Sequence, residues 1–196
     1  MLDGSRFTGL VVGGGTVALR KVRALLDGGV RVIVVASTIH PDLRALDANA
    51  PLTLITAPYS ADHIGDAFIV IAATDDAEVN ARVAHDALVL GRLVNVADVS
   101  GEGNFSTPAV HRSGDLTIAV SAGRLPAAAG VIRDAISARF DTRYGAAVAE
   151  LRGLRDRMLA NGDRDQWKAL AEELLGERFC SDVESGAIAS RVGSWR

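Results

Sequence analysis

Cysteine is almost absent from this sequence, which has Cys180 as its one cysteine among 196 residues. This scarcity excludes an internal disulfide and any cysteine-rich metal site. Aromatic residues are also few, at 5% of the chain against 48% for all hydrophobic residues, so we expect an aliphatic core. No apolar stretch approaches the roughly 20 residues needed to span a bilayer, and no basic-then-apolar leader is present. These absences predict a cytoplasmic protein with no membrane partner.

A strong excess of charge is lacking as well, because the formal net charge is only -3. This balance gives no electrostatic argument for a nucleic-acid partner. The four histidines (His40, His63, His85 and His111) are scattered and show no pattern of closely spaced pairs, so we predict no metal site built into the protein. A chain of 196 residues fits one main domain with an appendage.

The most informative feature present is a glycine-rich turn between an apolar strand and a helix. Residues 10–12 are Leu-Val-Val, residues 13–18 are Gly-Gly-Gly-Thr-Val-Ala, and a helical pattern continues to residue 26. Gly13 allows a tight turn, Gly15 lets the backbone approach a diphosphate, and Ala18 lets the helix pack closely on the strand. The start of the helix adds free N–H groups and the positive end of a dipole. The pattern predicts dinucleotide binding, and glycines kept for packing are the alternative explanation.

Strand and helix patterns alternate over the first hundred residues. We expect strands at 7–12, 31–36, 52–57, 68–73 and 93–97, and helices at 16–26, 41–48 and 77–90. Strands as apolar as 31–36 and 68–73 are typical of a parallel sheet that is covered on both faces. The alternation predicts an α/β fold with a Rossmann-like doubly wound parallel sheet.

After residue 100 the pattern changes. Two short strands, 105–110 and 115–120, flank a predicted turn, and an amphipathic helix with apolar residues from Val131 to Phe140 follows. Such a strand–strand–helix unit buries little core alone, so we expect it to dock against a second copy of the chain. We therefore divide the chain into three parts: a dinucleotide-binding Rossmann domain at 1–104, a dimerisation region at 105–143, and a helical C-terminal domain at 144–196.

The end of the second predicted strand lacks an expected residue. Ligands of open parallel sheets bind outside the carboxyl ends of the strands, and an acidic residue there commonly binds the adenosine ribose. Ser37 and Thr38 stand at this place instead. Their hydroxyls either contact the ribose or a phosphate, or cap the following turn. The choice between NAD and NADP therefore stays open.

Small residues follow the fourth predicted strand, where Ala73 and Thr74 leave room for a flat ring or a ribose. We interpret the next two carboxylates, Asp75 and Asp76, as caps of the following helix. Asp98 ends the fifth strand at the same edge of the sheet. Its carboxylate is either a general base or acid toward a substrate at this edge, or the start of a turn.

Several segments combine into a more specific pattern. They are residues 11–18 with Arg20 and Lys21, residues 72–76 (Ala-Ala-Thr-Asp-Asp) and residues 95–98 (Asn-Val-Ala-Asp). Residues 105–109 (Phe-Ser-Thr-Pro-Ala) and 116–121 (Leu-Thr-Ile-Ala-Val-Ser) extend it. In order and spacing the chain resembles the siroheme synthase dehydrogenase/chelatase family, which comprises precorrin-2 dehydrogenase and sirohydrochlorin ferrochelatase. The resemblance covers nearly the whole chain and weakens after about residue 145.

This resemblance implies an NAD-binding Rossmann domain, an intertwined homodimer and a helical C-terminal part. It also implies oxidation of precorrin-2 to sirohydrochlorin and, in some members, insertion of Fe²⁺ to give siroheme. The aspartate that is essential in the family falls on Asp98, and the cofactor contacts fall on Thr16, Val17, Ser37 and Thr38. Nothing in the sequence separates a dehydrogenase from a dehydrogenase that also chelates Fe²⁺.

The tetrapyrrole substrate that the resemblance implies carries several carboxylates. We assign its binding to Arg112, Ser121 and Arg124, with the two arginines as charge-assisted partners and with solvated loop arginines as the alternative. The loop at 121–126 departs from the family pattern, because Ala122 stands where some members have a serine. The role of that serine in handling the tetrapyrrole therefore does not carry over.

A different class of function also fits the glycine turn, namely a non-enzymatic module that senses NAD(H). Such modules usually keep the acidic ribose residue that is missing here, and they have no need of a carboxylate at Asp98. A small-molecule dehydrogenase is a further alternative, but it would normally require a larger substrate domain. We therefore favour the NAD-dependent oxidation of precorrin-2.

Overall fold

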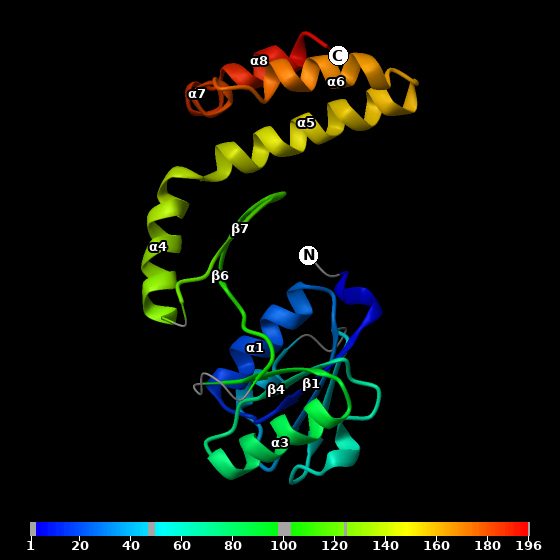
Figure 1. Cartoon of the computed structure of the whole chain (residues 1–196), viewed down its shortest axis with the longest axis vertical. Helices are drawn as coiled ribbons and strands as arrows, with labels where there is room; N and C mark the ends of the chain where they lie inside the picture. The colour runs from blue at the N-terminus through cyan, green and yellow to red at the C-terminus, as the bar shows by residue number, and fades with distance from the viewer. Residues whose placement is uncertain (1–2, 47–49, 98–102, 124, 196) are drawn as a thin grey trace. The chain divides into compact units, whose positions relative to one another are not determined.

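The computed structural model describes residues 3–46, 50–97, 103–123 and 125–195 (Figure 1). By its internal contacts the chain forms two compact units, Met1–Thr107 and Pro108–Arg196. The division into three parts that the sequence suggests, with boundaries near residues 104 and 143, stays a prediction.

The N-terminal unit is built on a sheet of parallel strands in the order β3-β2-β1-β4-β5. The strands are β1 (Thr8–Val12), β2 (Arg31–Ala36), β3 (Leu52–Thr56), β4 (Ile69–Ala72) and β5 (Leu93–Val96). The helices of this unit are α1 (Thr16–Asp27), α2 (Pro41–Arg44) and α3 (Ala77–Val89), with the short 3-10 helices η1 (Gly4–Arg6) and η2 (Ala61–His63). This arrangement confirms the predicted Rossmann-like fold.

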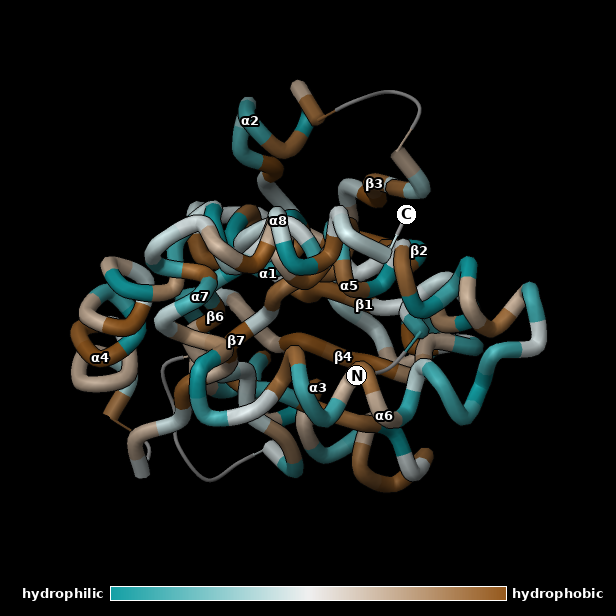
Figure 2. The backbone as a smooth tube through the Cα atoms, turned by 90° about the horizontal axis from the view of Figure 1, so that it is seen from above, coloured by the Kyte–Doolittle hydropathy of each residue, from teal (hydrophilic) through white to brown (hydrophobic). Residues whose placement is uncertain are grey.

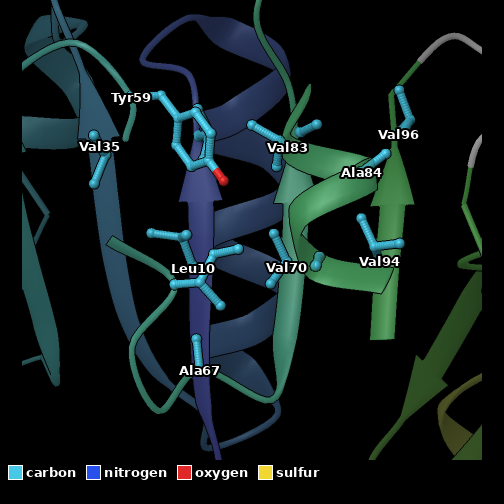
Figure 3. Close-up of a cluster of buried hydrophobic side chains, with 13 residues drawn as sticks. Leu10, Val35, Tyr59, Ala67, Val70, Val83, Ala84, Val94 and Val96 are labelled. Atoms are coloured by element: carbon cyan, nitrogen blue, oxygen red, sulfur yellow. The ribbon is translucent and has the colours of Figure 1, made fainter. Parts of the chain in front are cut away.

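Successive residues of each strand face opposite sides of the sheet, and a helix covers each side. Leu10 belongs to the cluster that includes Val83 of α3, and Figure 3 shows these two side chains on the same face. Val11 faces the other way and packs in a cluster with Ala18 and Val22 of α1. Because both faces are covered, the central strands are mostly apolar, as the brown colouring along β4 in Figure 2 shows.

The order of the strands reverses between β1 and β4. From β1 the chain adds β2 and then β3 along one direction of the sheet. It then returns to the other edge of β1 and adds β4 and then β5 in the opposite direction. Val12 of β1 pairs with both Val35 of β2 and Ala72 of β4, so β1, β2 and β4 end at nearly the same level. In open parallel sheets, ligands bind outside the carboxyl ends of the strands at such a switch point. The fold therefore places the glycine turn and the segment after β4 at the edge of the sheet where a nucleotide would bind.

The C-terminal unit consists of a hairpin followed by helices. Its elements are β6 (Ala109–Ser113), β7 (Leu116–Val120), α4 (Pro126–Arg139), α5 (Thr142–Ala160), α6 (Arg164–Leu174), α7 (Phe179–Ser185) and α8 (Ala187–Gly193). Buried residues of α5, such as Leu151 and Leu154, form one cluster with Leu174 of α6 and Ile188 of α8. Within the described ranges, no helix is both long enough and apolar enough to cross a membrane.

The first strand of the hairpin begins at residue 109 and not at the predicted residue 105, whereas β7 agrees with the predicted strand at 115–120 to within one residue. The turn predicted between the strands at 111–114 is therefore wrong. The turn falls at Gly114 and Asp115, with Gly114 at a φ of +52°. His111 consequently lies within β6, and its Nε2 is 2.6 Å from the carbonyl oxygen of Phe140. The physical reason for the shift is that residues 104 and 105 bind the edge of β5 instead of pairing in the hairpin.

Helix α4 buries little of its apolar surface within the C-terminal unit. Ala129 is buried, whereas Val131 and Ile132 are 71% and 45% exposed. This is the amphipathic helix that we expect to dock on a second copy of the chain. The homodimer itself stays a prediction.

One carboxylate links the corner between α4 and α5 to α7. Glu184 Oε1 accepts hydrogen bonds from Arg139 Nε at 3.0 Å and from the Tyr144 hydroxyl at 2.9 Å. The hydrogen bond from Tyr144, together with that from Arg139, holds the pKa of Glu184 below its ordinary value. Burial and the hydrogen bond to Glu184 raise the pKa of Tyr144 to about 12, so its hydroxyl remains a donor at neutral pH.

We expect this cluster to make the C-terminal unit less stable as the pH falls into the acidic range. Because the pKa of Glu184 is lowered in the folded protein, its stabilising contribution is present above the unfolded pKa and is lost as the pH falls through the folded pKa. Glu184→Gln should therefore remove part of the fall in melting temperature between neutral pH and a pH of about 3.

The matched control is Glu177→Gln, at an exposed glutamate in the turn before α7. This variant should show the same pH dependence of the melting temperature as the unmodified protein. Indistinguishable pH profiles for the two variants would contradict the assignment to Glu184.

Candidate functional site

The glycine turn is held against both neighbouring strands. The N–H of Gly13 donates to the carbonyl of Val35, the residue before the last in β2, at 2.9 Å. Gly13 has a φ of +125°, a conformation that side chains other than hydrogen rarely permit. A Cβ atom at this position would also overlap the carbonyl oxygen of Ala73, directly after β4. The tight turn predicted for Gly13 is therefore present, and it needs glycine for two separate reasons.

Gly14 has a role that the sequence analysis missed. A Cβ atom here would overlap the carbonyl oxygen of Thr38, and the carbonyl of Gly14 accepts a hydrogen bond from the N–H of His40 at 2.8 Å. The loop after β2 thus packs directly on the turn. The available signal was the middle glycine of the three, because the dinucleotide pattern requires glycine only at positions 13 and 15.

Gly15 differs from both, because its side is open. A Cβ atom at Gly15 would have no heavy atom within 4 Å, and the residue is exposed. Gly15 is the N-cap of α1 and supplies no side-chain cap, while Thr16 is exposed and Val17 is half-buried. The first N–H groups of α1 therefore face space that an anion can occupy, and the helix dipole favours negative charge there.

The segment after β4 is fixed by an asparagine. The side chain of Asn80 accepts from the N–H of Thr74 at 3.1 Å and donates to the carbonyl of Thr74 at 3.0 Å. The Thr74 hydroxyl is within 2.8 Å of the same amide oxygen, so all the polar atoms of Thr74 are engaged. Ala73 before it is buried, and its N–H donates to the carbonyl of Val12 at 2.7 Å. Backbone and small side chains, rather than free hydroxyls, form this wall of the site.

Asn80 was also missed by the sequence analysis. It is 5% exposed, and it lies inside α3, where asparagine is a poor helix former. A buried asparagine on the apolar face of a helix must find hydrogen-bond partners, so its position was a usable signal. The predicted capping by Asp76 is confirmed, since its Oδ1 accepts from the N–H groups of Glu78 and Val79 at 2.9 and 3.1 Å.

The fifth strand leads into the segment that carries Asp98. Asp98 lies outside the described residues, as does Arg124. Directly before Asp98, the N–H of Ala97 donates to the carbonyl of Ala72 at 2.8 Å. This bond keeps the end of β5 beside the end of β4, at the edge of the sheet that bears the glycine turn.

A set of side-chain hydrogen bonds holds the chain on both sides of residues 98–102. Lys21 Nζ donates to Asn95 Oδ1 at 3.0 Å and to Thr107 Oγ1 at 2.9 Å. Asn95 Nδ2 in turn donates to the carbonyl of Phe105 at 3.1 Å. Asn104 completes the set, because the N–H of Val94 donates to its Oδ1 at 2.8 Å. The chain thus leaves and rejoins the sheet at fixed points.

The remaining predicted residues lie in two places. Ser37 and Thr38 follow β2 and are exposed, so their hydroxyls are accessible at the edge of the sheet. Arg112 in β6 and Ser121 directly after β7 are exposed residues of the C-terminal unit. Their roles toward cofactor and substrate stay predictions.

The edge of the sheet fits a dinucleotide. The open side of Gly15, the uncapped start of α1 and the small residues after β4 together leave room and N–H donors for a diphosphate. Among the described residues, no group of three or more histidine, cysteine, aspartate or glutamate side chains is placed to hold a metal ion.

Comparison with known proteins agrees with this geometry. Residues 1–109 match the sequence model of a family described as "Putative NAD(P)-binding". The chain belongs to this NAD(P)-binding family. Siroheme synthase 1 of Aeromonas salmonicida is 35% identical over 91% of this chain, and siroheme synthase of Pseudomonas paraeruginosa is 37% identical over 93%. The chain spans only 40% and 38% of the lengths of these two relatives.

Among solved structures, the NAD(P)-binding chain is similar to "SirC, precorrin-2 dehydrogenase". The two have a TM-score of 0.82 and 26% sequence identity, and the similarity covers 99% of this chain and 98% of the other. These matches confirm the resemblance to siroheme synthase-type proteins that the sequence motifs indicate.

The three glycines of the turn allow the cofactor site to be tested apart from the fold. Gly15→Asp should abolish NAD⁺ binding, because it places a carboxylate where the diphosphate must lie, and should leave the melting temperature nearly unchanged because its side is open. Calorimetric titration of the folded variant with NAD⁺ measures the first effect, and thermal unfolding measures the second.

The matched variant Gly14→Ala should instead lower the melting temperature. Its Cβ overlaps a backbone carbonyl, so it should cost about 1–3 kcal/mol of stability or more. Unchanged NAD⁺ affinity in Gly15→Asp would show that the glycine turn serves packing alone.

Proposed function

We propose that this chain is an NAD-dependent precorrin-2 dehydrogenase that oxidises precorrin-2 to sirohydrochlorin in siroheme biosynthesis. The observation that carries the proposal is the open glycine turn at the switch point of the sheet, at the same edge as the end of β5, which leads to Asp98. The similarity to a precorrin-2 dehydrogenase over nearly the full length of both chains supports the choice of substrate.

We assign the cofactor to the carboxyl edge of the sheet in the N-terminal unit. Gly13 and Gly15 with the N–H groups of Thr16 and Val17 would hold the diphosphate, because they combine close approach with unpaired donors at a helix start. Ser37 and Thr38 would contact the ribose, while the backbone at Ala73 and Thr74 would flank the nicotinamide half. Bound NAD⁺ supplies the hydride acceptor.

The protein itself contributes orientation and a base. Oxidation of precorrin-2 removes a hydride and a proton, so a group that accepts the proton is required beside the reacting ring. We assign this role to the carboxylate of Asp98. The hydrogen bonds of Ala97 to β4, and of Lys21 and Asn95 to the returning chain, fix the backbone that flanks this aspartate. Proximity of base, cofactor and substrate lowers the entropic part of the barrier.

The substrate and assembly assignments concern the C-terminal unit. Arg112, Ser121 and Arg124 would bind the carboxylates of the tetrapyrrole, since guanidinium groups form paired hydrogen bonds with carboxylates. A homodimer would cover the exposed residues Val131 and Ile132 of α4. Insertion of Fe²⁺ as a second substrate would use the same carboxylate, Asp98, to accept pyrrole protons.

Replacement of Asp98 tests the proposed chemistry. Asp98→Asn keeps the shape of the side chain but cannot accept a proton, so the turnover of precorrin-2 should fall about 10²–10⁴-fold. The affinity for NAD⁺ should be unchanged, because the side chain addresses the substrate. Anaerobic assays that follow sirohydrochlorin and NADH together measure turnover, and the same samples with Fe²⁺ measure chelation.

The control is Asp75→Asn, at an exposed aspartate on the same edge of the sheet. It should retain most of the activity. If Asp98→Asn also retains its activity and only the melting temperature changes, then Asp98 caps a turn and the proposed mechanism is wrong.

The homodimer can be tested at α4. Val131→Glu places a charge on a side chain that is 71% exposed in the single chain, so it should disrupt the dimer without unfolding the chain. Val89→Glu, at an equally exposed valine of α3, should leave the dimer intact. Size-exclusion chromatography with light scattering measures the masses. A folded, strictly monomeric unmodified protein would contradict the assignment.

A further inference from the structure

A groove lies between α5 and α6, and none of the residues assigned above to dehydrogenation lines it. The two helices are joined by a short turn, so they run antiparallel and side by side (Figure 1). The groove has a volume of about 590 Å³. This size is within the range of sites that bind small organic ligands.

Helix α6 lines the groove with two adjacent rows of side chains. Trp167 and Ala171 of α6 and Leu175, the C-cap residue directly after it, are spaced four residues apart and form an apolar row. Trp167 is half-buried against the core of the unit, whereas Leu175 is 52% exposed. The partly exposed indole of Trp167 and isobutyl group of Leu175 therefore form an apolar wall. A flat ring can stack against this wall.

The second row of α6 carries charge. Arg164 and Lys168 are four residues apart, beside Trp167, and both line the groove. Among the residues that the structure describes, neither forms an ion pair with a carboxylate. Helix α5 contributes a third cation, Arg155, which is paired with Asp156 at 3.1 Å. The cationic side chains therefore exceed the single lining carboxylate, Glu172.

The combination selects a class of ligand. The apolar row favours a flat conjugated ring, and the arginine and lysine beside it favour carboxylates on the periphery of that ring. A tetrapyrrole with peripheral carboxylates has both features. We infer that the α5–α6 groove is a second tetrapyrrole site, which holds the ring on Trp167 and its carboxylates on Arg164 and Lys168. The choice of tetrapyrrole rests on the proposed function, because precorrin-2 and sirohydrochlorin belong to this class.

A site of this kind would bind the macrocycle without chemistry, through residues other than those assigned to dehydrogenation. Its contacts are exposed ion pairs and one aromatic face, each of which contributes little to affinity. Its affinity should therefore be modest and should fall as salt is added, since exposed charges are screened.

The experiment uses uroporphyrin I, a planar tetrapyrrole with eight peripheral carboxylates, as the probe. The chain has only two tryptophans, Trp167 and Trp195, so the variant Trp195→Phe reports on Trp167 alone. Titration of this variant should quench the fluorescence of Trp167. The added changes Arg164→Glu and Lys168→Glu should weaken the binding about tenfold or more, because two favourable charges become repulsive.

A matched pair controls for net charge. Arg157→Glu with Arg178→Glu changes the charge equally at exposed positions that do not line the groove, and it should leave the binding unchanged. The neutral variants Arg164→Gln and Lys168→Gln give a second measure if the reversed charges disturb the fold. They should weaken binding less than the glutamate variants, and circular dichroism checks that each variant is folded.

Several results would overturn the inference. It fails if uroporphyrin does not quench Trp167, or if the quenching is the same in the charge-reversed and unmodified proteins. It also fails if reversal at Arg164 and Lys168 halves the mass of the protein in solution, since a second copy then occupies the groove. Precorrin-2 turnover is measured separately on the same variants and should be unchanged. A protein without this turnover that still binds uroporphyrin through Arg164 would refute the proposed function and leave the groove as a tetrapyrrole site.

Discussion

The close packing of a side-chain-free turn on the ends of two strands is the constraint on which the N-terminal unit depends. Gly13 and Gly14 bring the backbone after β1 against the carbonyls of Ala73 and Thr38, where no Cβ atom fits. This packing joins the ends of β2, β1 and β4 at one level. It also leaves Gly15 and the start of α1 as the open side of the turn. The packing of Gly13 and Gly14 therefore fixes the turn, and the open side at Gly15 leaves space for a diphosphate.

Asparagine and lysine side chains extend this order to the rest of the edge. Asn80 fixes the backbone of Thr74 through two hydrogen bonds, and Asn104 satisfies backbone groups at the edge of β5. Lys21 reaches from α1 to Asn95 and Thr107. These polar side chains pair backbone N–H and C=O groups that no neighbouring strand pairs. They also hold the ends of the loops that follow the strands.

Most of the fold could be predicted from the sequence because its signals are local. The apolar strands, the glycine turn and the cap at Asp76 each depend on a few neighbouring residues, and the structure confirms them. The first strand of the hairpin was placed too early because Asn104 pairs with Val94, ten residues away in the sequence, and no local pattern reports such a contact. Asn80 was missed although its place on the apolar face of α3 was a usable signal.

The candidate site could be predicted only in part. The positions of the glycines followed from the turn pattern, but the packing role of Gly14 depends on Thr38 in a different loop. Arg164, Lys168 and Trp167 line one groove because of how α6 packs against α5, and periodicity alone does not fix this packing. The roles of Ser37, Thr38, Asp98 and the substrate arginines remain predictions, because they depend on bound molecules rather than on the chain.

If the proposed function is correct, the open glycine turn serves hydride transfer from a tetrapyrrole rather than the sensing of a nucleotide. The most direct measurement is an anaerobic incubation of the unmodified protein with precorrin-2 and either NAD⁺ or NADP⁺, in which the absorbance of product and reduced cofactor is followed together. A role in hydride transfer predicts that sirohydrochlorin and NADH form in equal amounts and at a rate proportional to the protein concentration. Tight binding of NAD⁺ with no oxidation of precorrin-2 by either cofactor would contradict it.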